Sequence, residues 1–247
     1  MLAIIGGSGL TRLANLAEER REIVRTPYGQ PSGPLTFGHL RRCPAIFIAR
    51  HGDGHTIPPH EVNYRANVWA LKQAGASCIV AIASVGGIRA DLGPGSLVVP
   101  HQLIDYTWGR KSTFHEGGGG AVVHTDFTQP YDPELRRVLL AAAREAGQTV
   151  VDGGVYAATQ GPRLETAAEI DRLERDGADI VGMTGMPEAV LARELELPYA
   201  AITVVSNHAA GRGESKLGIR FASLDEILCQ TMERVRRIVE MICVSRE

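Results

Sequence analysis

The chain has 247 residues, of which 44% are hydrophobic and 22% are charged, a composition that is ordinary for a globular protein. Its formal net charge of -2 excludes the strongly basic surface with which proteins bind nucleic acid or anionic membranes, so any anion must be bound locally. No apolar run approaches the ~18 residues of a membrane span, and the start of the chain lacks the basic and apolar regions of a signal peptide. We therefore expect neither a nucleic-acid partner nor a membrane partner.

Short apolar runs alternate with helical patterns through the first half of the chain. Strands are predicted at residues 2–5, 45–49, 78–83 and 96–100, and a helix at 62–74. The run CIVAIA at 78–83 is apolar without interruption, which is typical of a strand that is buried on both faces. Tyr64, Val68 and Leu71 recur at helical spacing, and Gly75 follows them as a stop signal.

The second half shows the same alternation, with recognisable helix starts. The predicted elements are helices at 132–147, 166–177, 187–195 and from 223 onward, and strands at 155–158, 180–183 and 199–205. Asp132 is a typical N-cap, and Thr166 with Glu169 and Ser223 with Glu226 have the spacing of capping boxes. We find no repeat and no linker, so the pattern predicts a single α/β domain over residues 1–247.

Three of the predicted strands end in turns of glycine and serine or threonine, namely GGSG, SVGG and GMTG. Open α/β sheets bind ligands beyond the carboxyl ends of their strands. Backbone amides and the hydroxyls of Ser8, Ser84 and Thr184 could together hold a small anion there. Each motif is also compatible with an ordinary tight turn. The sequence completes neither the GxGxxG nor the GxxxxGK[ST] nucleotide-binding pattern.

The stretch RHGDGHTIPPH, residues 50–60, contains three histidines and an aspartate at spacings that a metal site could use. However, it begins with Arg50, whose permanent positive charge repels a cation. Gly52 and Gly54 allow backbone amides to point at a ligand, which suits an anion. A metal site, an anion site and a polar loop all remain open from these residues alone. If Arg50 and the three turns converge in space, an inorganic phosphate site is favoured.

The four cysteines are Cys43, Cys78, Cys229 and Cys243. They are widely scattered and form no CxxC pair, and Cys78 and Cys229 lie within apolar runs. This distribution predicts reduced thiols in the core of a cytoplasmic protein.

Several separate motifs in the expected order resemble the trimeric purine nucleoside phosphorylase family. They are IIGGSGL, ARHGDGHTIPPHEVNYRANVWALK, TQGPRLETAAEIDRLERDGADIVGMTGMPEAVLARE and VVSNH, and the similarity spans residues 3–238. The 5′-methylthioadenosine phosphorylases are the most similar branch. The resemblance implies a mixed central β-sheet flanked by helices, and phosphate-dependent cleavage of a purine N-glycosidic bond. It also implies a homotrimer with sites at subunit interfaces, no metal, and no cofactor besides phosphate as co-substrate.

The resemblance assigns the cluster around Arg50 to phosphate. The residues that it places on this anion are Ser8, Arg50, His51, Ser84 and Thr184. The chemistry agrees, because a guanidinium fork, an amide and hydroxyls suit a tetrahedral oxyanion. His55 and His60 remain open between a structural hydrogen bond and an indirect role in the site.

By the same resemblance, Asn207, Glu165 and His51 are the expected catalytic residues, and Leu164, Glu165 and Asn207 surround the base. The methylthioadenosine branch carries aspartate where this chain has Asn207, and tends to carry serine where it has Glu165. An amide can donate to O6 and accept from a protonated N7, and a carboxylate can accept from N1–H, so both residues favour a 6-oxopurine. Glu165 could also be an acid favoured at a helix N-terminus. Gly185, after Thr184, departs from the expected pattern.

The sugar end differs from the inosine-cleaving members, which place a histidine where this chain has Leu224. Leu224 and Ile227, together with Met183, predict an apolar wall, and His124 matches a residue that the methylthio branch lends from a neighbouring subunit. An apolar wall suits a methylthio group and leaves a buried hydroxyl without a partner. The combination predicts a 5′-methylthioinosine phosphorylase. The alternatives are a general inosine/guanosine phosphorylase, a methylthioadenosine phosphorylase, and a non-catalytic protein that binds nucleoside or phosphate.

Overall fold

The structure is a computed structural model that describes residues 1–117 and 121–242; within the last helix, the side chains of residues 221–225 are not described. The strands are β1 (Leu2–Gly6), β2 (Ala17–Glu22), β3 (Leu35–Leu40), β4 (Cys43–Ala49), β5 (Cys78–Gly87), β6 (Leu97–Val99), β7 (Gln102–Asp105), β8 (Val151–Asp152), β9 (Val155–Ala158), β10 (Ile180–Gly182) and β11 (Tyr199–His208). The helices are α1 (Tyr64–Gln73), α2 (Pro133–Glu145), α3 (Ala167–Arg175), α4 (Gly185–Glu194) and α5 (Phe221–Ile242), with a short 3-10 helix η1 (Gly213–Ser215).

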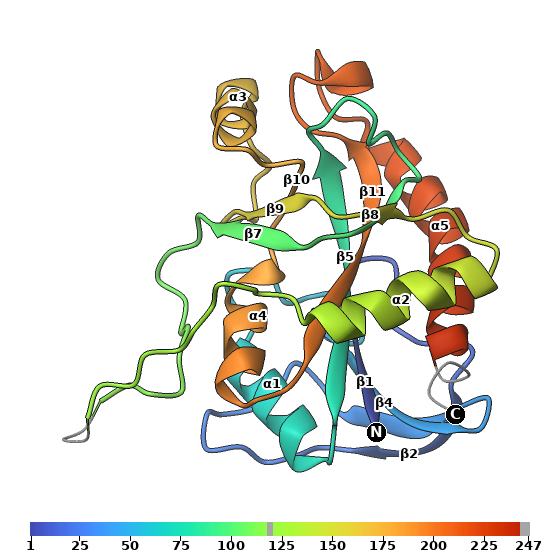
Figure 1. Cartoon of the computed structure of the whole chain (residues 1–247), viewed down its shortest axis with the longest axis vertical. Helices are drawn as coiled ribbons and strands as arrows, with labels where there is room; N and C mark the ends of the chain where they lie inside the picture. Colours follow the sequence, from blue (N-terminus) through green and yellow to red (C-terminus); the bar gives the residue numbers. More distant parts are fainter. Residues whose placement is uncertain (118–120, 243–247) are drawn as a thin grey trace.

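The strands of the described residues form one mixed sheet of eleven strands (Figure 1). Parallel pairing joins β4 to β1 and β1 to β5, and β11 runs parallel to β5 along nearly its whole length. β10 pairs antiparallel with the far end of β5 and leads through β9 to β7. β2 and β3 extend the sheet beyond β4 as antiparallel strands. This is the mixed α/β sheet that the resemblance implies.

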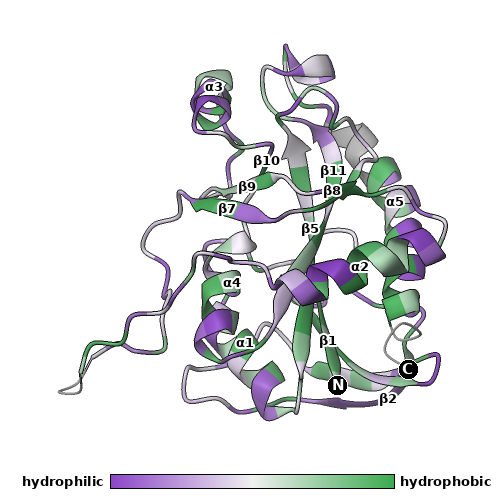
Figure 2. Cartoon of the chain, in the orientation of Figure 1, coloured by the Kyte–Doolittle hydropathy of each residue, from purple (hydrophilic) through white to green (hydrophobic). Residues whose placement is uncertain are grey.

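Alternate residues of the central strands face opposite sides of the sheet, and helices cover both sides. In β1, Ala3 and Ile5 belong to the core that includes residues of α1 and α4, whereas Leu2 and Ile4 belong to the core that includes residues of α2 and α5. Figure 2 shows β1 as predominantly hydrophobic, in agreement with the burial of all its residues. A strand that is covered on both faces has no polar side, which explains the uninterrupted apolar runs in the sequence.

Of the three helix starts predicted from capping residues, two are confirmed and one is wrong. The side chain of Asp132 accepts a hydrogen bond from the backbone at the start of α2, and Thr166 forms a complete capping box at the start of α3. α5, in contrast, begins at Phe221. The capping-box pattern of Ser223 with Glu226 therefore lies inside the first turns of the helix, and the predicted start is two residues late.

Four strands escaped prediction, namely β2, β3, β7 and β8. β2 has the sequence AEERRE with every residue exposed, so it shows none of the apolar alternation by which strands are recognised. Figure 2 shows it as hydrophilic at the edge of the sheet. Charged side chains on an edge strand hinder pairing with further chains, which gives this composition a physical role.

The cysteine prediction is confirmed for Cys78, which is buried in β5. For Cys229 it is wrong, because this residue is exposed on α5 while its neighbour Leu228 is buried. An amphipathic helix turns successive residues to different sides, so an apolar run does not by itself imply burial. Cys243 lies outside the described residues.

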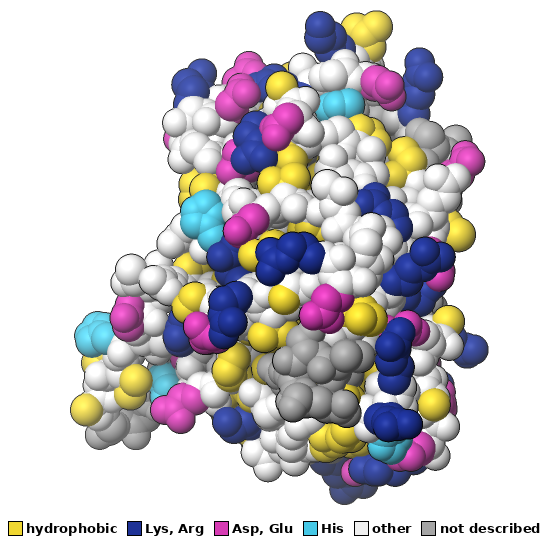
Figure 3. Space-filling view, turned by 45° about the vertical axis from the view of Figure 1, so that its right-hand side comes forward, with side chains coloured by type: hydrophobic (Ala, Val, Ile, Leu, Met, Phe, Trp, Pro, Cys, Tyr) yellow, Lys and Arg dark blue, Asp and Glu magenta, His cyan; other side chains and the backbone are white. Residues whose placement is uncertain are grey.

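Charged side chains of both signs cover the surface that Figure 3 presents. Lys and Arg side chains alternate there with Asp and Glu side chains, as the small net charge suggests. Among the helices of the described residues, none combines the length and the apolar character needed to cross a membrane.

Candidate active site

The site originates in an interruption along one edge of β5. β11 occupies one edge of β5, and β1 and β10 share the other. β1 pairs with β5 as far as Ala81, and β10 pairs with it only at Gly86 and Gly87. Between these pairings, residues 82–85 of β5 lie beside no other strand of the described chain on this edge. The carboxyl ends of β1 and β4 reach the same level, because both strands run parallel to β5.

A cavity of about 710 Å³ opens at this interruption, a size that suits a small-molecule ligand. The predicted site residues that line it are Ser8, Arg50, His51, Ser84, Leu164, Glu165, Met183, Thr184 and Asn207. They come from strand ends and from the segment before α3, which lie far apart in the sequence. The three glycine-containing turns and Arg50 therefore do converge in space.

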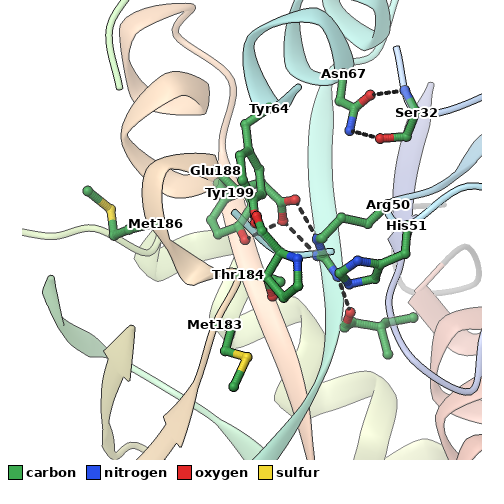
Figure 4. A network of polar contacts seen from close by, with 12 residues as sticks. Ser32, Arg50, His51, Tyr64, Asn67, Met183, Thr184, Met186, Glu188 and Tyr199 are labelled. Atoms are coloured by element: carbon green, nitrogen blue, oxygen red, sulfur yellow. Dashed lines mark hydrogen bonds and ion pairs between the residues drawn. The ribbon is translucent and has the colours of Figure 1, made fainter. Parts of the chain in front are cut away.

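Arg50 follows β4 and is buried in an ion pair with Glu188 of α4 (Figure 4). Its Nε and Nη2 atoms donate to the Glu188 carboxylate at 2.7 and 2.8 Å, and its Nη1 donates to the Ile82 carbonyl at 2.9 Å. Tyr199 also donates to Glu188, at 2.8 Å. Burial alone would lower the pKa of Arg50, but the adjacent carboxylate outweighs it and the pKa is raised. The guanidinium therefore stays charged.

This pairing corrects one part of the sequence interpretation of Arg50. The bidentate fork that the interpretation assigns to phosphate is occupied by Glu188. Nη1 and Nη2 each have a second hydrogen besides the one that they donate to Ile82 and Glu188, so these two N–H groups are left for contact with an anion in the cavity.

Gly7 allows the end of β1 to approach this guanidinium closely. A Cβ atom on Gly7 would lie 2.5 Å from the Ile82 carbonyl oxygen and 2.8 Å from Nη1 of Arg50. Neither distance is tolerable, so the position requires glycine. The GGSG motif is thus a tight turn and at the same time a wall of the cavity, with Ser8 lining the cavity directly after it.

His51 lies beside Arg50, with its ring held by the backbone (Figure 4). Its Nδ1 atom is 2.8 Å from the Ile57 carbonyl oxygen. A carbonyl can only accept, so Nδ1 carries the hydrogen of a neutral ring. Burial, followed by the positive charge of Arg50, lowers the pKa of His51 to about 4. The ring is therefore neutral at neutral pH, and its Nε2 is an acceptor.

Thr184 is the N-cap residue of α4, but its hydroxyl accepts no capping hydrogen bond from the helix backbone. Its side chain is buried against the cavity, and its backbone N–H donates to the Tyr156 hydroxyl at 3.2 Å. A Cβ atom on Gly185 would lie 2.5 Å from Cε1 of Tyr156. The glycine that departs from the family pattern is thus matched to a buried tyrosine beneath the turn.

The amide of Asn207 has a fixed orientation at the end of β11. Its Nδ2 donates to the His208 carbonyl at 2.7 Å, and its Oδ1 accepts from the Ser206 hydroxyl at 2.9 Å. Because the carbonyl can only accept, the nitrogen must be the atom that faces it. One N–H and one lone pair of Oδ1 remain for a ligand in the cavity. β11 shifts its register against β5 between Val205 and Asn207, at the point where this side chain is needed.

Glu165 lies between the cavity and the start of α3. The Thr159 hydroxyl donates to its Oε1 at 2.7 Å and so fixes the carboxylate. Thr166, not Glu165, caps the helix, and Glu169 completes the capping box. The alternative in which Glu165 serves only the helix N-terminus therefore has less support than a role in the cavity, which Glu165 lines.

The predicted sugar contacts are only partly assembled in this one chain. Met183 lines the cavity, whereas Ile227 is half-buried and does not; its neighbour Leu228 takes that place. One residue along a helix turns the side chain by about 100°, which is enough to move it to another side. The side chain of Leu224 lies outside the described residues. His124 is exposed on the segment that leads to α2, which projects from the body of the molecule in Figure 1.

Sequence reasoning missed the residues that hold the ligand-facing groups in place. Glu188 orients Arg50, Thr159 orients Glu165, and Ile219 and Leu228 contribute apolar walls. Only Glu188 gave a usable signal, because it is a lone acid in the apolar run MPEAVLA. A charged residue in such a run is rarely buried without a partner, which would have predicted a buried arginine beside it.

The histidines of the 50–60 segment do not form a metal site within the described residues. No group of three or more His, Cys, Asp or Glu side chains in this part of the chain is placed to hold a metal ion. His55 lines the cavity, with its Nε2 3.5 Å from the Ser8 hydroxyl, whereas His60 does not line it. Whether the protein works without a metal stays a prediction.

Comparison with known proteins places these features in a family. The chain matches the phosphorylase superfamily over residues 1–242. It is 56% identical over 215 residues to the probable S-methyl-5'-thioinosine phosphorylase of Xanthomonas campestris pv. campestris, which covers 87% of this chain and 86% of the relative. It is 46% identical over 221 residues to the 6-oxopurine nucleoside phosphorylase of Pyrococcus furiosus, which covers 87% and 82% of the two chains.

Among solved structures, the methylthioadenosine phosphorylase of Schistosoma mansoni in complex with adenine superposes with a TM-score of 0.94. The sequences are 34% identical, and the superposition covers 100% of this chain and 92% of the other. The family match includes every strand end that contributes to the cavity. The chain therefore belongs to the phosphorylase superfamily.

Proposed function

We propose that this protein is a pentosyltransferase that cleaves 5′-methylthioinosine with inorganic phosphate, giving hypoxanthine and 5-methylthioribose 1-phosphate. The observation that carries the proposal is the pair formed by Asn207 and Glu165. Both line one cavity, and each is held by a hydrogen bond that determines which of its atoms remain free.

The free atoms are complementary to a 6-oxopurine. Asn207 has one N–H that can donate to O6 and one lone pair that can accept from a protonated N7. The Glu165 carboxylate can accept from N1–H, which adenine lacks. An adenine would bring its amino group against the Asn207 N–H and leave Glu165 without a donor, at a cost of about 1–3 kcal/mol for each unmatched buried group.

The phosphate side of the cavity supports a phosphorolytic reaction. Cleavage of the glycosidic bond leaves positive charge on the sugar and negative charge on the purine. A phosphate held by Ser8, His51, Ser84, Thr184 and the guanidinium of Arg50 would stabilise the cationic sugar and then capture it at C1. As the bond from C1 to the purine breaks and the bond from C1 to a phosphate oxygen forms, the purine would take up the proton that hydrogen phosphate releases. Asn207 would stabilise the leaving purine as its N7 gains that proton. This chemistry uses no cofactor beyond phosphate.

The apolar walls favour a methylthio group at the 5′ position. Ile219, Leu228 and Met183 line the cavity and offer no hydrogen bond to a hydroxyl through their side chains. The relative in Xanthomonas campestris, which is described as a probable S-methyl-5'-thioinosine phosphorylase, supports this choice. The second candidate is a general 6-oxopurine nucleoside phosphorylase, which the relative in Pyrococcus furiosus supports.

We further propose a cytoplasmic homotrimer in which each cavity is completed by a neighbouring subunit. This would bring His124, which is exposed in the single chain, to the sugar of an adjacent site. The exposed apolar side chains Trp108, Val122 and Val123 on the same projecting segment support an interface there.

The test is a substrate panel of methylthioinosine, inosine, guanosine and methylthioadenosine, each with and without phosphate. We expect phosphate-dependent release of free base from the 6-oxopurines and little release from methylthioadenosine. Preferred cleavage of methylthioadenosine would refute the assignment of the base pocket. No cleavage of any nucleoside would favour a binding protein instead of an enzyme.

A further inference from the structure

The hydrogen bond of His51 determines which of its ring nitrogens is left to face a ligand in the cavity. The ring lines the cavity beside Arg50, and its Nδ1 is committed to the Ile57 carbonyl at 2.8 Å. Within the described residues, no protein group forms a hydrogen bond with Nε2. The nitrogen that is left for a ligand in the cavity is therefore the one without a hydrogen, so it must be offered a hydrogen by the ligand.

We propose that His51 makes the anion subsite selective for oxyanions that carry a hydroxyl, such as hydrogen phosphate and hydrogen arsenate, over oxyanions that carry none, such as sulfate. This proposal rests on the proposed function, because it takes phosphate as the anion of this cavity. Inorganic phosphate retains at least one P–OH group throughout the pH range of an enzyme assay. Sulfate has no hydroxyl there, and one of its oxygens would face the lone pair of Nε2.

The surroundings of His51 keep the ring neutral. The charged and titratable groups that act on it are Arg50, at the end of the same strand, and His55, whose ring centroid is 4.7 Å away. Both oppose a second proton on the ring. The carboxylate of Glu188, which is buried on α4, is held by Arg50 in the ion pair. The remaining N–H groups of Arg50 and the backbone amides can only donate, and the hydroxyls can do either, so His51 is the group in the subsite that can only accept.

The discrimination should be about tenfold to a hundredfold, because one hydrogen bond to a charged group is replaced by an unmatched contact between two acceptors. Phosphate, arsenate, sulfate and monofluorophosphate provide the comparison. Monofluorophosphate is the matched probe, since its dianion has the charge and shape of hydrogen phosphate with fluorine in place of the hydroxyl. Binding to the intact protein is measured by titration calorimetry, so an answer is obtained even where no nucleoside is cleaved.

We expect phosphate and arsenate to bind with similar affinity, and sulfate and monofluorophosphate to bind at least about tenfold more weakly. The affinity for sulfate, which stays a dianion, should hold from about pH 6 to about pH 8, because the ring does not titrate in this range. Equal binding of all four anions, or sulfate binding that strengthens steadily as the pH falls, would show that His51 takes up a proton and donates. Either result would overturn the proposal, as would a failure of phosphate to bind.

Two substitutions distinguish a direct role of His51 in anion selectivity from a general effect of changing this loop. His51→Gln places an amide in the cavity that can turn its NH2 toward the anion, so the preference for phosphate over sulfate should shrink to within a few-fold. His60→Gln changes a histidine of the same loop that does not line the cavity, and it should leave the preference intact. A preference that survives His51→Gln would assign the selectivity to another group. Selectivity without any phosphorolysis would refute the proposed function while leaving this inference standing.

Discussion

At Arg50, the proposed anion binding and the stability of the fold depend on the same guanidinium. Glu188 is completely buried, and its carboxylate accepts from both Arg50 and Tyr199. Removal of one member of a buried ion pair leaves the other charge without compensation, which typically costs about 3–5 kcal/mol. Replacement of both members by apolar residues of similar size is often close to neutral. This asymmetry makes it possible to separate the two roles of Arg50.

We predict that Glu188→Ala lowers the free energy of unfolding by about 3–5 kcal/mol, whereas Arg50→Met combined with Glu188→Leu recovers most of that loss. The double variant should nevertheless have a strongly raised KM for phosphate, because the guanidinium of Arg50 is gone. Urea unfolding measures the first effect and steady-state kinetics the second. A double variant that is stable and keeps the wild-type KM for phosphate would remove Arg50 from the anion subsite.

Among the secondary-structure elements, β5 decides where the site lies. On one edge, its neighbour changes from β1 to β10, which leaves a gap between the two pairings. The turn after β10 places Met183 and Thr184 at this gap. The turn is seated on Tyr156, which leaves room only for glycine at positions 182 and 185. Packing beneath the turn therefore sets the position of the Thr184 hydroxyl.

We predict that Gly185→Ala lowers the free energy of unfolding by about 1–3 kcal/mol, because the added methyl group would overlap Tyr156. Gly33→Ala is the control, since a Cβ atom there would meet only Asp53, at 3.9 Å, and it should be nearly neutral. In a double-mutant cycle, Tyr156→Val should make the added methyl group less costly. If Gly185→Ala costs no more than Gly33→Ala, the close packing under the turn is not as described.

The buried strands and the residues that face the cavity could be predicted from the sequence. Continuous apolar runs identify β1 and β5, and the turns that follow them identify Ser8 and Ser84. β2 could not be predicted, because its pairing with β3 is stabilised by backbone hydrogen bonds and its side chains are all exposed. The commitment of Arg50 to Glu188 was equally inaccessible, since the two residues are 138 positions apart and meet only in the folded chain.

At the scale of the whole molecule, the segment of residues 106–117 and 121–130 runs from the neighbourhood of the cavity to the exposed surface. Near its start, Arg110 donates to the carbonyls of Met183 and Met186 at 2.8 and 2.6 Å, and to that of Gln160 at 2.7 Å. Further along, Val122 is 80% exposed. An apolar side chain so far out of the core is a reasonable contact for a second copy of the chain.

If each site is shared between two subunits, defects in different subunits should complement one another. We predict that His124→Ala and Asn207→Asp each lower kcat/KM for the nucleoside by about tenfold or more. Mixed trimers, formed by co-expression of the two variants, should recover about a quarter of the wild-type activity, since random assortment in a head-to-tail ring gives that share of intact sites. A mixture no more active than its separate components would show that His124 does not act across an interface.

The most direct test of the central claim is the ratio of kcat/KM for 5′-methylthioinosine to kcat/KM for inosine in the wild-type protein at saturating phosphate. The two nucleosides share the base and differ at the 5′ position, so the ratio isolates the sugar end. An unpartnered hydroxyl against an apolar wall costs ~1–3 kcal/mol, while the methylthio group is favoured there. The account therefore predicts a preference for methylthioinosine of roughly ten- to hundredfold. A ratio near unity would contradict it and identify a general 6-oxopurine nucleoside phosphorylase.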